Sequence, residues 1–261
     1  MSKVDRLQSL KYGLRHPIAT FSFLRESQRI KGNREHTFPS LQQKNFTNRW
    51  EGLVLSLVGT HHITLDSGAI SSKYEEKMKE IGAVYGAHEP SVLSLEESLA
   101  LYSVIKTVKP EIVVETGVSD GMSSVMILNA IKDNGKGQLY SIDYPEVGMP
   151  RLYRKEPGWI VDDDLRESWT LIYGKTNDRM PPLLEKLRSV DVFLHDSEHS
   201  YLNMRFEFSL ALKYMHRGSV LLSDDVTSNS AIVDSLIENE VGVGNMIILR
   251  DDKSDFGGTI I

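Results

Sequence analysis

Two short acidic clusters follow apolar runs of the chain, and their side chains could hold a divalent cation. Asp196 follows the run 190–195, while Asp224 and Asp225 follow the run 218–223. Each run is typical of a buried strand, and the carboxyl ends of parallel strands form the ligand crevice of an open sheet. Three carboxylates gathered there repel one another unless a cation binds them, and oxygen ligands suit Mg²⁺, Ca²⁺ or Mn²⁺.

A glycine-containing loop after the first predicted strand could hold a nucleotide. Gly117 and Gly121, in E-T-G-V-S-D-G-M-S-S, permit a tight turn and close approach to a ligand, and Ser123 lies in the first turn of the next helix. The loop lacks the G-x-G-x-x-G spacing of dinucleotide sites. Asp143 ends the next strand, where an acid either accepts hydrogen bonds from a ribose diol or caps a turn. With the glycine loop nearby, we favour the ribose.

Two further segments could contribute to the same nucleotide site, although their sequence patterns are less specific. Gly174 and Lys175 follow the third predicted strand and either border an adenine ring or form an ordinary turn. The long connection 144–169 contains Tyr144 and Trp159, which either cover the bound cofactor or pack within the connection itself. Its Asp162-Asp163-Asp164 run is expected to be the solvated first turn of a helix.

Strands and helices alternate along most of the chain, which indicates βαβ units and a parallel sheet. A capping box of Ser94 and Glu97 opens a helix that runs to about residue 107. Further helices are predicted at 122–132, 181–188, 201–215 and 228–239. Strands are predicted at 111–116, 138–143, 170–173, 190–195 and 218–223. Two last strands, near 245–250 and 257–261, have so short a link that we expect them to be antiparallel.

The first 92 residues show no such alternation. We assign 1–92 to a mostly helical cap that carries substrate specificity, with helical pieces near 4–30 and 71–83, and 93–261 to the ligand-binding domain. The apolar stretch 52–58 fits either a strand or a helix.

The amino-acid composition excludes several kinds of chemistry and of membrane association. The 261 residues include no cysteine, which excludes disulfides and thiolate chemistry, and no apolar run long enough to span a membrane. The net charge is −6, yet residues 1–50 hold 10 basic and 3 acidic side chains. This basic segment either docks on the acidic body or contacts an anionic membrane surface. We expect a cytoplasmic protein without a nucleic-acid partner, and leave a homo-oligomer open.

Together the motifs resemble those of the class I S-adenosylmethionine-dependent methyltransferases over about residues 93–261. The resemblance rests on E-T-G-V-S-D-G-M-S-S, S-I-D-Y-P, G-W-I-V-D-D-D-L-R-E-S-W-T-L-I-Y-G-K, F-L-H-D-S-E-H-S-Y and L-L-S-D-D-V. The last two are similar to metal-dependent O-methyltransferases of the catechol, macrolide and aminocoumarin sugar types. The resemblance implies an α/β fold: a Rossmann-like, doubly wound, seven-stranded sheet with its last strand antiparallel, plus the N-terminal helical cap.

The resemblance also implies roles for individual residues. Asp196, Asp224 and Asp225 match the positions that hold Mg²⁺ or another divalent cation, and Asp196 also borders the cofactor. The methionine portion of S-adenosylmethionine lies near the glycine loop and its ribose at the acid after the second strand. The cofactor-binding residues implied are Glu115, Gly117, Gly121, Ser123, Asp143, Gly174, Lys175 and Asp196.

In the same subgroup a base follows the first metal-binding aspartate by two or three residues. His199 is our first choice, because the unperturbed pKa of histidine, roughly 6.5, lies near working pH. Glu198 is the second choice, and the alternative is that neither acts as a base. His195 lies within a predicted strand, so we expect it to be packed and hydrogen-bonded rather than a ligand.

We therefore predict an S-adenosylmethionine-dependent O-methyltransferase, Mg²⁺-dependent, that acts on a hydroxyl of a small molecule or sugar. One alternative is a cephalosporin-hydroxylase-like enzyme on the same fold, which would use the carboxylates with iron and 2-oxoglutarate. Another is a cofactor-binding module without catalysis, whose first 90 residues bind a partner.

Overall fold

The computed structural model describes residues 36–39, 41, 45–59, 67–86, 92–144, 155–250 and 255–261. The predicted helical piece near 4–30 lies outside these residues, as does most of the basic segment 1–50, for which membrane contact was one of two predictions. Across the described ranges, no helix is both long and apolar enough to span a bilayer.

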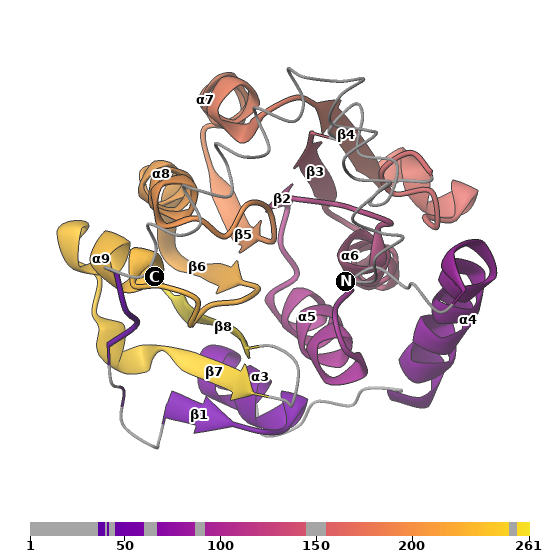
Figure 1. Ribbon diagram of the computed structural model, residues 1–261, viewed down its shortest axis with the longest axis horizontal. Coiled ribbons are helices and arrows are strands. Elements are labelled where there is room, and N and C mark those ends of the chain that lie inside the picture. Colours follow the sequence, from indigo (N-terminus) through magenta and orange to yellow (C-terminus); the bar gives the residue numbers. More distant parts are fainter. Residues whose placement is uncertain are drawn as a thin grey trace, which may run out of the picture.

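One mixed sheet runs through the middle of the molecule (Figure 1). Within the described ranges it has eight strands, in the order β1-β7-β8-β6-β5-β2-β3-β4. Their bounds are β1 Phe46–Thr47, β2 Ile112–Thr116, β3 Gln138–Asp143, β4 Trp169–Tyr173, β5 Val190–His195, β6 Met215–Ser223, β7 Ile247–Arg250 and β8 Asp255–Ile260. β8 is antiparallel to both β6 and β7, and every other neighbouring pair is parallel. The predicted seven strands with an antiparallel last strand are therefore present, and the two-residue β1 adds an edge strand beside β7.

Helices cover both faces of the sheet, so the fold has three layers (Figure 1). One face carries α3 (Trp50–Val58), α4 (Ser67–Tyr85), α5 (Leu95–Val108) and α6 (Met122–Asn134), and the other carries α7 (Thr176–Leu187), α8 (Tyr201–Ala211) and α9 (Ala231–Glu238). Each face has its own apolar core, because successive residues of a strand point to opposite faces. In β5, for example, Val192 and Leu194 pack in one core and Phe193 packs in the other.

Local signals place several element ends as predicted. Ser94 accepts from the Glu97 amide, and the Glu97 carboxylate accepts from the Ser94 amide, which is the predicted capping box at the start of α5. The stretch 52–58 is helical, within α3. Asp163 and Asp164 are exposed in the first turn of a 3₁₀ helix, η3 (Asp163–Ser168), as expected of a solvated turn.

Among the helices predicted after residue 93, two differ from the structure by four residues or more at one end. α8 stops at Ala211 rather than 215, because Met215 pairs with Val190 and already belongs to β6. α7 begins at Thr176 rather than 181, and its two prolines lie inside the helix.

The segment before residue 92 packs on the same body. β1 pairs with β7, and Trp50 and Leu53 of α3 belong to the core that also holds α5 and α6. α4 is tied to the start of η3 by buried Lys77, whose Nζ lies 2.5 Å from Asp162 Oδ1. A domain boundary at residue 92 stays a prediction, and the structure adds that this segment completes the edge of the sheet and one of its covering layers.

Candidate functional site

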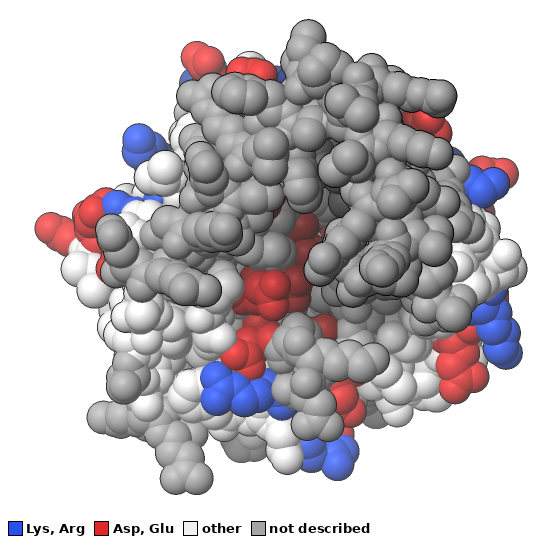
Figure 2. Space-filling model, in the orientation of Figure 1, with Lys and Arg blue, Asp and Glu red and all other residues white. Residues whose placement is uncertain are grey.

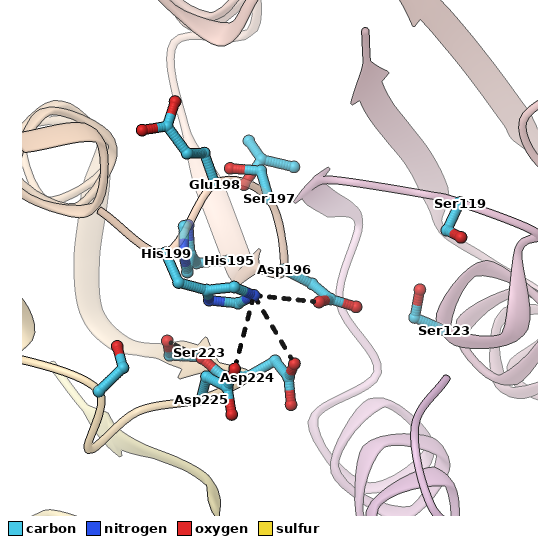
Figure 3. Close-up of polar contacts among 12 residues, drawn as sticks. Ser119, Ser123, His195, Asp196, Ser197, Glu198, His199, Ser223, Asp224 and Asp225 are labelled. Carbon is cyan, nitrogen blue, oxygen red and sulfur yellow. Dashed lines mark hydrogen bonds and ion pairs between the residues drawn. The ribbon is translucent and has the colours of Figure 1, made fainter. Parts of the chain in front are cut away.

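Three carboxylates meet at the carboxyl ends of β5 and β6. These strands are parallel neighbours, with His195 paired to Ser223, so the residues that follow them lie side by side. The amide of Asp224 donates to the carbonyl of His195 at 2.9 Å, which joins the two strand ends. Asp196, Asp224 and Asp225 therefore gather as the sequence indicated (Figure 3). Their role as cation ligands stays a prediction.

His199 points into the middle of this cluster (Figure 3). Its Nε2 lies 4.0 Å from Asp196 Oδ1, 3.9 Å from Asp224 Oδ2 and 4.0 Å from Asp225 Oδ2. Ligand atoms of His199, Asp196 and Asp224 all lie within 4.8 Å of one another, which is close enough to share one ion. The other candidate base, Glu198, turns away from the carboxylates (Figure 3).

The cluster carries more negative charge than its surroundings balance. Burial raises the pKa of Asp196 well above its usual range, and the neighbouring charge of Asp224 raises it further. Burial raises the pKa of Asp224 to about 7, with the charges of Glu97 and Asp225 adding to the effect. Carboxylates that cost this much to ionise side by side are ready to bind a cation, which would remove the repulsion.

Glu97 is a contributor that the sequence did not reveal as part of the site. The sequence identified it as the third residue of the capping box, and the structure shows that role as well. Its buried carboxylate also raises the pKa of both Asp196 and Asp224. A local motif explained the residue completely, so no sequence signal pointed to this second effect.

A buried network lies behind the cluster. His195 is fully buried, as expected, and its Nδ1 lies 2.7 Å from the Glu207 carboxylate of α8. Glu207 also accepts from Thr116 and Ser197, and the His195 charge lowers the pKa of Glu207 against the effect of burial. The His195 ring meets the His199 ring edge-on, with centroids 5.2 Å apart. In the sequence, Glu207 is the one acidic residue among the buried, otherwise apolar positions of α8, and this pattern could have identified it.

The glycine loop after β2 directly adjoins the carboxylates. A Cβ on Gly117, which has φ +83°, would lie 1.9 Å from the Asp196 carbonyl oxygen, so a side chain is excluded there. Asp143, at the end of β3, accepts from the amides of Val118 and Ser119 at 2.7 and 2.9 Å. One oxygen of Asp143 thus fixes the loop, and burial raises the pKa of the group.

Glu115 is enclosed beneath the same loop. Its carboxylate accepts from the hydroxyls of Ser123, Ser124 and Ser141 at 2.5, 2.6 and 2.6 Å. Burial raises its pKa, although these hydrogen bonds oppose the shift. The Ser123 hydroxyl is therefore engaged inside the protein, and a ligand would meet the backbone amides of the first turn of α6, which have no partners within the helix.

A connecting segment covers the glycine loop. The amides of Gly158 and Ile160 donate to the carbonyls of Ser119 and Asp120 at 2.9 and 3.3 Å. A Cβ on Gly121 would lie 2.8 Å from the Gly158 Cα. The indole of Trp159 donates to Asp120, so the ring is fixed against the loop from outside.

The two remaining predicted residues lie beyond the end of β4. The amide of Gly174 donates to the Asp143 carbonyl at 2.9 Å. The Nζ of Lys175 lies 5.3 Å from the ring centroid of Tyr144, which is 48% exposed. These residues border the Asp143 side of the crevice, away from the carboxylate cluster.

Acidic side chains gather in a hollow at the middle of the face viewed (Figure 2).

Comparison with known proteins agrees with this geometry. Residues 114–226 match the family described as a methyltransferase domain, a range that spans every predicted site residue. A search of curated protein sequences gave no significant match.

Solved structures of similar fold are methyltransferases or cofactor-bound proteins. They include cofactor-bound Rv0187 from MTB (14% identity, 71% of this chain and 89% of that chain, TM-score 0.54). They also include TomG, an O-methyltransferase from Streptomyces achromogenes involved in tomaymycin synthesis, in complex with S-adenosylmethionine (15% identity, 71% of this chain and 89% of that chain, TM-score 0.52). A third is the O-methyltransferase from Bacillus cereus in complex with S-adenosylhomocysteine (16% identity, 73% of this chain and 91% of that chain, TM-score 0.50).

The strand order, the glycine loop at the end of β2 and the matched domain agree on one conclusion. Residues 114–226 match a methyltransferase domain, and the described residues have the fold of solved methyltransferases.

Proposed function

We propose that this protein is an S-adenosylmethionine-dependent O-methyltransferase that acts on a hydroxyl of a small molecule or sugar and holds a divalent cation beside the cofactor. The observation that carries the proposal is the convergence of Asp196, Asp224 and Asp225 around one point, in contact with the glycine loop. A cation at that point would lie next to the cofactor, where an acceptor oxygen has to be.

The residues present fit both groups. Oxygen donors, repelling one another and facing a common centre, suit a divalent cation. The first turn of α6 offers free amides to the carboxylate of the cofactor's methionine portion, and Asp143 retains a second oxygen for a ribose hydroxyl. S-adenosylmethionine supplies an activated methyl group when bound.

The transfer is an in-line displacement. A bond forms between the acceptor oxygen and the methyl carbon, the bond from that carbon to the sulfonium sulfur breaks, and the hydroxyl proton is released. A bound divalent cation would lower the pKa of the acceptor hydroxyl and fix its direction. Asp196 connects the two halves of the site, because its backbone contacts Gly117 while its side chain belongs to the carboxylate cluster.

The proton can leave through Asp225, whose side chain is 47% exposed and is the most open of the three carboxylates. Glu198 faces away from the cluster, and the Nε2 of His199 faces three carboxylates (Figure 3). A hydroxyl that is already acidified needs only a weak proton acceptor.

Methyl transfer from isotopically labelled S-adenosylmethionine to a panel of phenols, diols and sugars tests the proposal, with EDTA or a divalent cation present. We expect cation-stimulated methyl ether formation, and we expect Asp224→Ala to abolish the stimulation while S-adenosylmethionine affinity changes less than about threefold.

Two results would contradict the proposal. One is undiminished transfer in EDTA by the wild-type protein and by Asp224→Ala. The other is turnover that requires iron and 2-oxoglutarate and yields no methylated product, which would favour the oxidative alternative.

A further inference from the structure

The position of His199 carries an inference that rests on the proposed function and makes its cation site more specific. Its Nε2 is nearly equidistant from oxygens of Asp196, Asp224 and Asp225, at 4.0, 3.9 and 4.0 Å. Each distance exceeds that of a hydrogen bond. The nitrogen therefore faces the three carboxylates at ion-pair distance.

Ligand atoms of Asp196, His199 and Asp224, which all lie within 4.8 Å of one another, can be arranged around one ion. Two ligand atoms that each lie about 2.1 Å from a shared cation are ~3.0 Å apart at a right angle and ~4.2 Å apart in a straight line. The separations of 4.0 and 3.9 Å from Nε2 to oxygens of Asp196 and Asp224 fall inside this range. A general base, in contrast, needs to lie within about 3.2 Å of a substrate proton, in a direction not filled by other anions.

The surroundings hold His199 in this direction. Its carbonyl accepts from the side-chain amide of Asn229 at 3.1 Å, and Ser200, the next residue, is the N-cap of α8. The His195 ring packs edge-on against the His199 ring and is itself held by Glu207.

We propose that His199 binds the cation through Nε2, as a third ligand beside Asp196 and Asp224, so that the site prefers a first-row transition-metal dication to Mg²⁺. All-oxygen sites suit Mg²⁺ and Ca²⁺, whereas imidazole shifts affinity toward the transition metals. The preference follows from one nitrogen in the donor set and needs no change in the carboxylates.

Spectroscopy of bound Mn²⁺ tests the proposal directly in the full-length protein. Electron spin-echo modulation of the Mn²⁺ complex is expected to show one coupled ¹⁴N nucleus, which changes to the ¹⁵N pattern when the histidines are ¹⁵N-labelled. His199→Ala is expected to lose this coupling and to weaken Mn²⁺ binding at least about tenfold. The Mn²⁺-over-Mg²⁺ preference of the wild type is expected to shrink with it.

Two matched variants control for general effects. His216→Ala removes an exposed histidine that pairs with Asp191 at a distance from the carboxylates, and Glu198→Gln changes the neighbour that faces away. Both are expected to keep the nitrogen coupling and the wild-type Mn²⁺ affinity.

The possible failures are distinguishable. Tight Mn²⁺ binding by the wild type without any nitrogen coupling would overturn the role of His199 and leave the carboxylate cation site intact. Coupling that survives in His199→Ala would also overturn it. Absence of Mn²⁺ and Mg²⁺ binding by the wild type would overturn the cation site itself, and with it the cation-dependent part of the proposed function.

Discussion

The two sides of the crevice balance their buried charges differently. On the β2–β3 side, Glu115 accepts from three serine hydroxyls and Asp143 accepts from two loop amides, so each carboxylate has protein partners. On the β5–β6 side, burial and Asp224 raise the pKa of Asp196, and burial, Glu97 and Asp225 raise the pKa of Asp224.

The β2–β3 side is therefore a preorganised binding surface, whereas the β5–β6 side still needs a positive charge. Hydrogen bonds from the protein fix the glycine loop before any ligand arrives, which reduces the entropy lost on binding. The carboxylate side requires a charge that the described residues do not supply. We therefore expect the first side to control cofactor affinity and the second to control the response to a cation.

The largest expected effect is at Asp196, where the two sides meet. Asp196→Ala removes a predicted cation ligand next to Gly117, so turnover should fall at least about 100-fold and both S-adenosylmethionine and cation affinity should decrease. Calorimetric titration of each ligand, with the other absent and then present, measures the two losses. Loss of cation affinity alone would show that the two sides are independent even at their boundary.

Asp143→Ala should affect one side only. The amides of Val118 and Ser119 lose a charged acceptor, so S-adenosylmethionine affinity should fall about 10- to 100-fold. Mn²⁺ affinity, followed by the loss of free-ion spin resonance signal, should change less than about twofold. A parallel decrease in Mn²⁺ binding would contradict the division between the sides.

Removing charge from the cation side should stabilise the cation-free protein in a pH-dependent way. The folded pKa of Asp224 is about 7 against an ordinary 3.8, so ionisation opposes folding. The cost is fully present above pH 7 and disappears as the pH falls from about 7 toward 4. Asp224→Asn should therefore raise the melting temperature by ~5 °C or more at pH 8 and hardly change it at pH 4.

The melting curves are recorded by circular dichroism in EDTA. Asp163→Asn, which alters an exposed carboxylate outside the site, serves as the control and should leave the melting temperature unchanged at both pH values. An equal gain for Asp224→Asn at pH 4 and pH 8 would rule out charge repulsion as its cause.

The smallest expected effect is on the β2–β3 side, where each buried carboxylate has hydrogen-bond partners in the protein. Ser124→Ala removes one of three donors to Glu115 and should cost about 1 kcal/mol of unfolding free energy, or ~2–4 °C in melting temperature. Ser56→Ala, at an exposed position of α3, is the matched control and should change neither quantity. A stabilised Ser124→Ala variant would mean that the hydroxyls do not stabilise the buried Glu115 carboxylate.

Most of the fold could be predicted from short-range patterns. The runs around Val192 and Leu221 are buried strands, and Ser94 with Glu97 marks a helix start, because strand burial and helix capping depend on neighbouring residues. The end of α8 was wrong by four residues, since pairing of Met215 with distant Val190 decides where β6 begins. Pro181 and Pro182, typical of a first helical turn, similarly hid the earlier start of α7.

The same distinction between local patterns and contacts distant in the sequence applies to the candidate site. Parallel strands end at one edge of a sheet, so sequence order was sufficient to bring Asp196, Asp224 and Asp225 together. The direction of His199, the burial of Glu207 behind it and the effect of Glu97 on the carboxylate pKa values depend on side-chain packing between separate elements.

The sequence by itself thus determined the element types, the family resemblance and the crevice in which the acids gather. Tertiary structure alone decided which of these acids have protein partners and which are left to repel one another. The physical reason is that strand and helix patterns are local, whereas the pKa of a buried carboxylate is set by distances to groups far away in the chain.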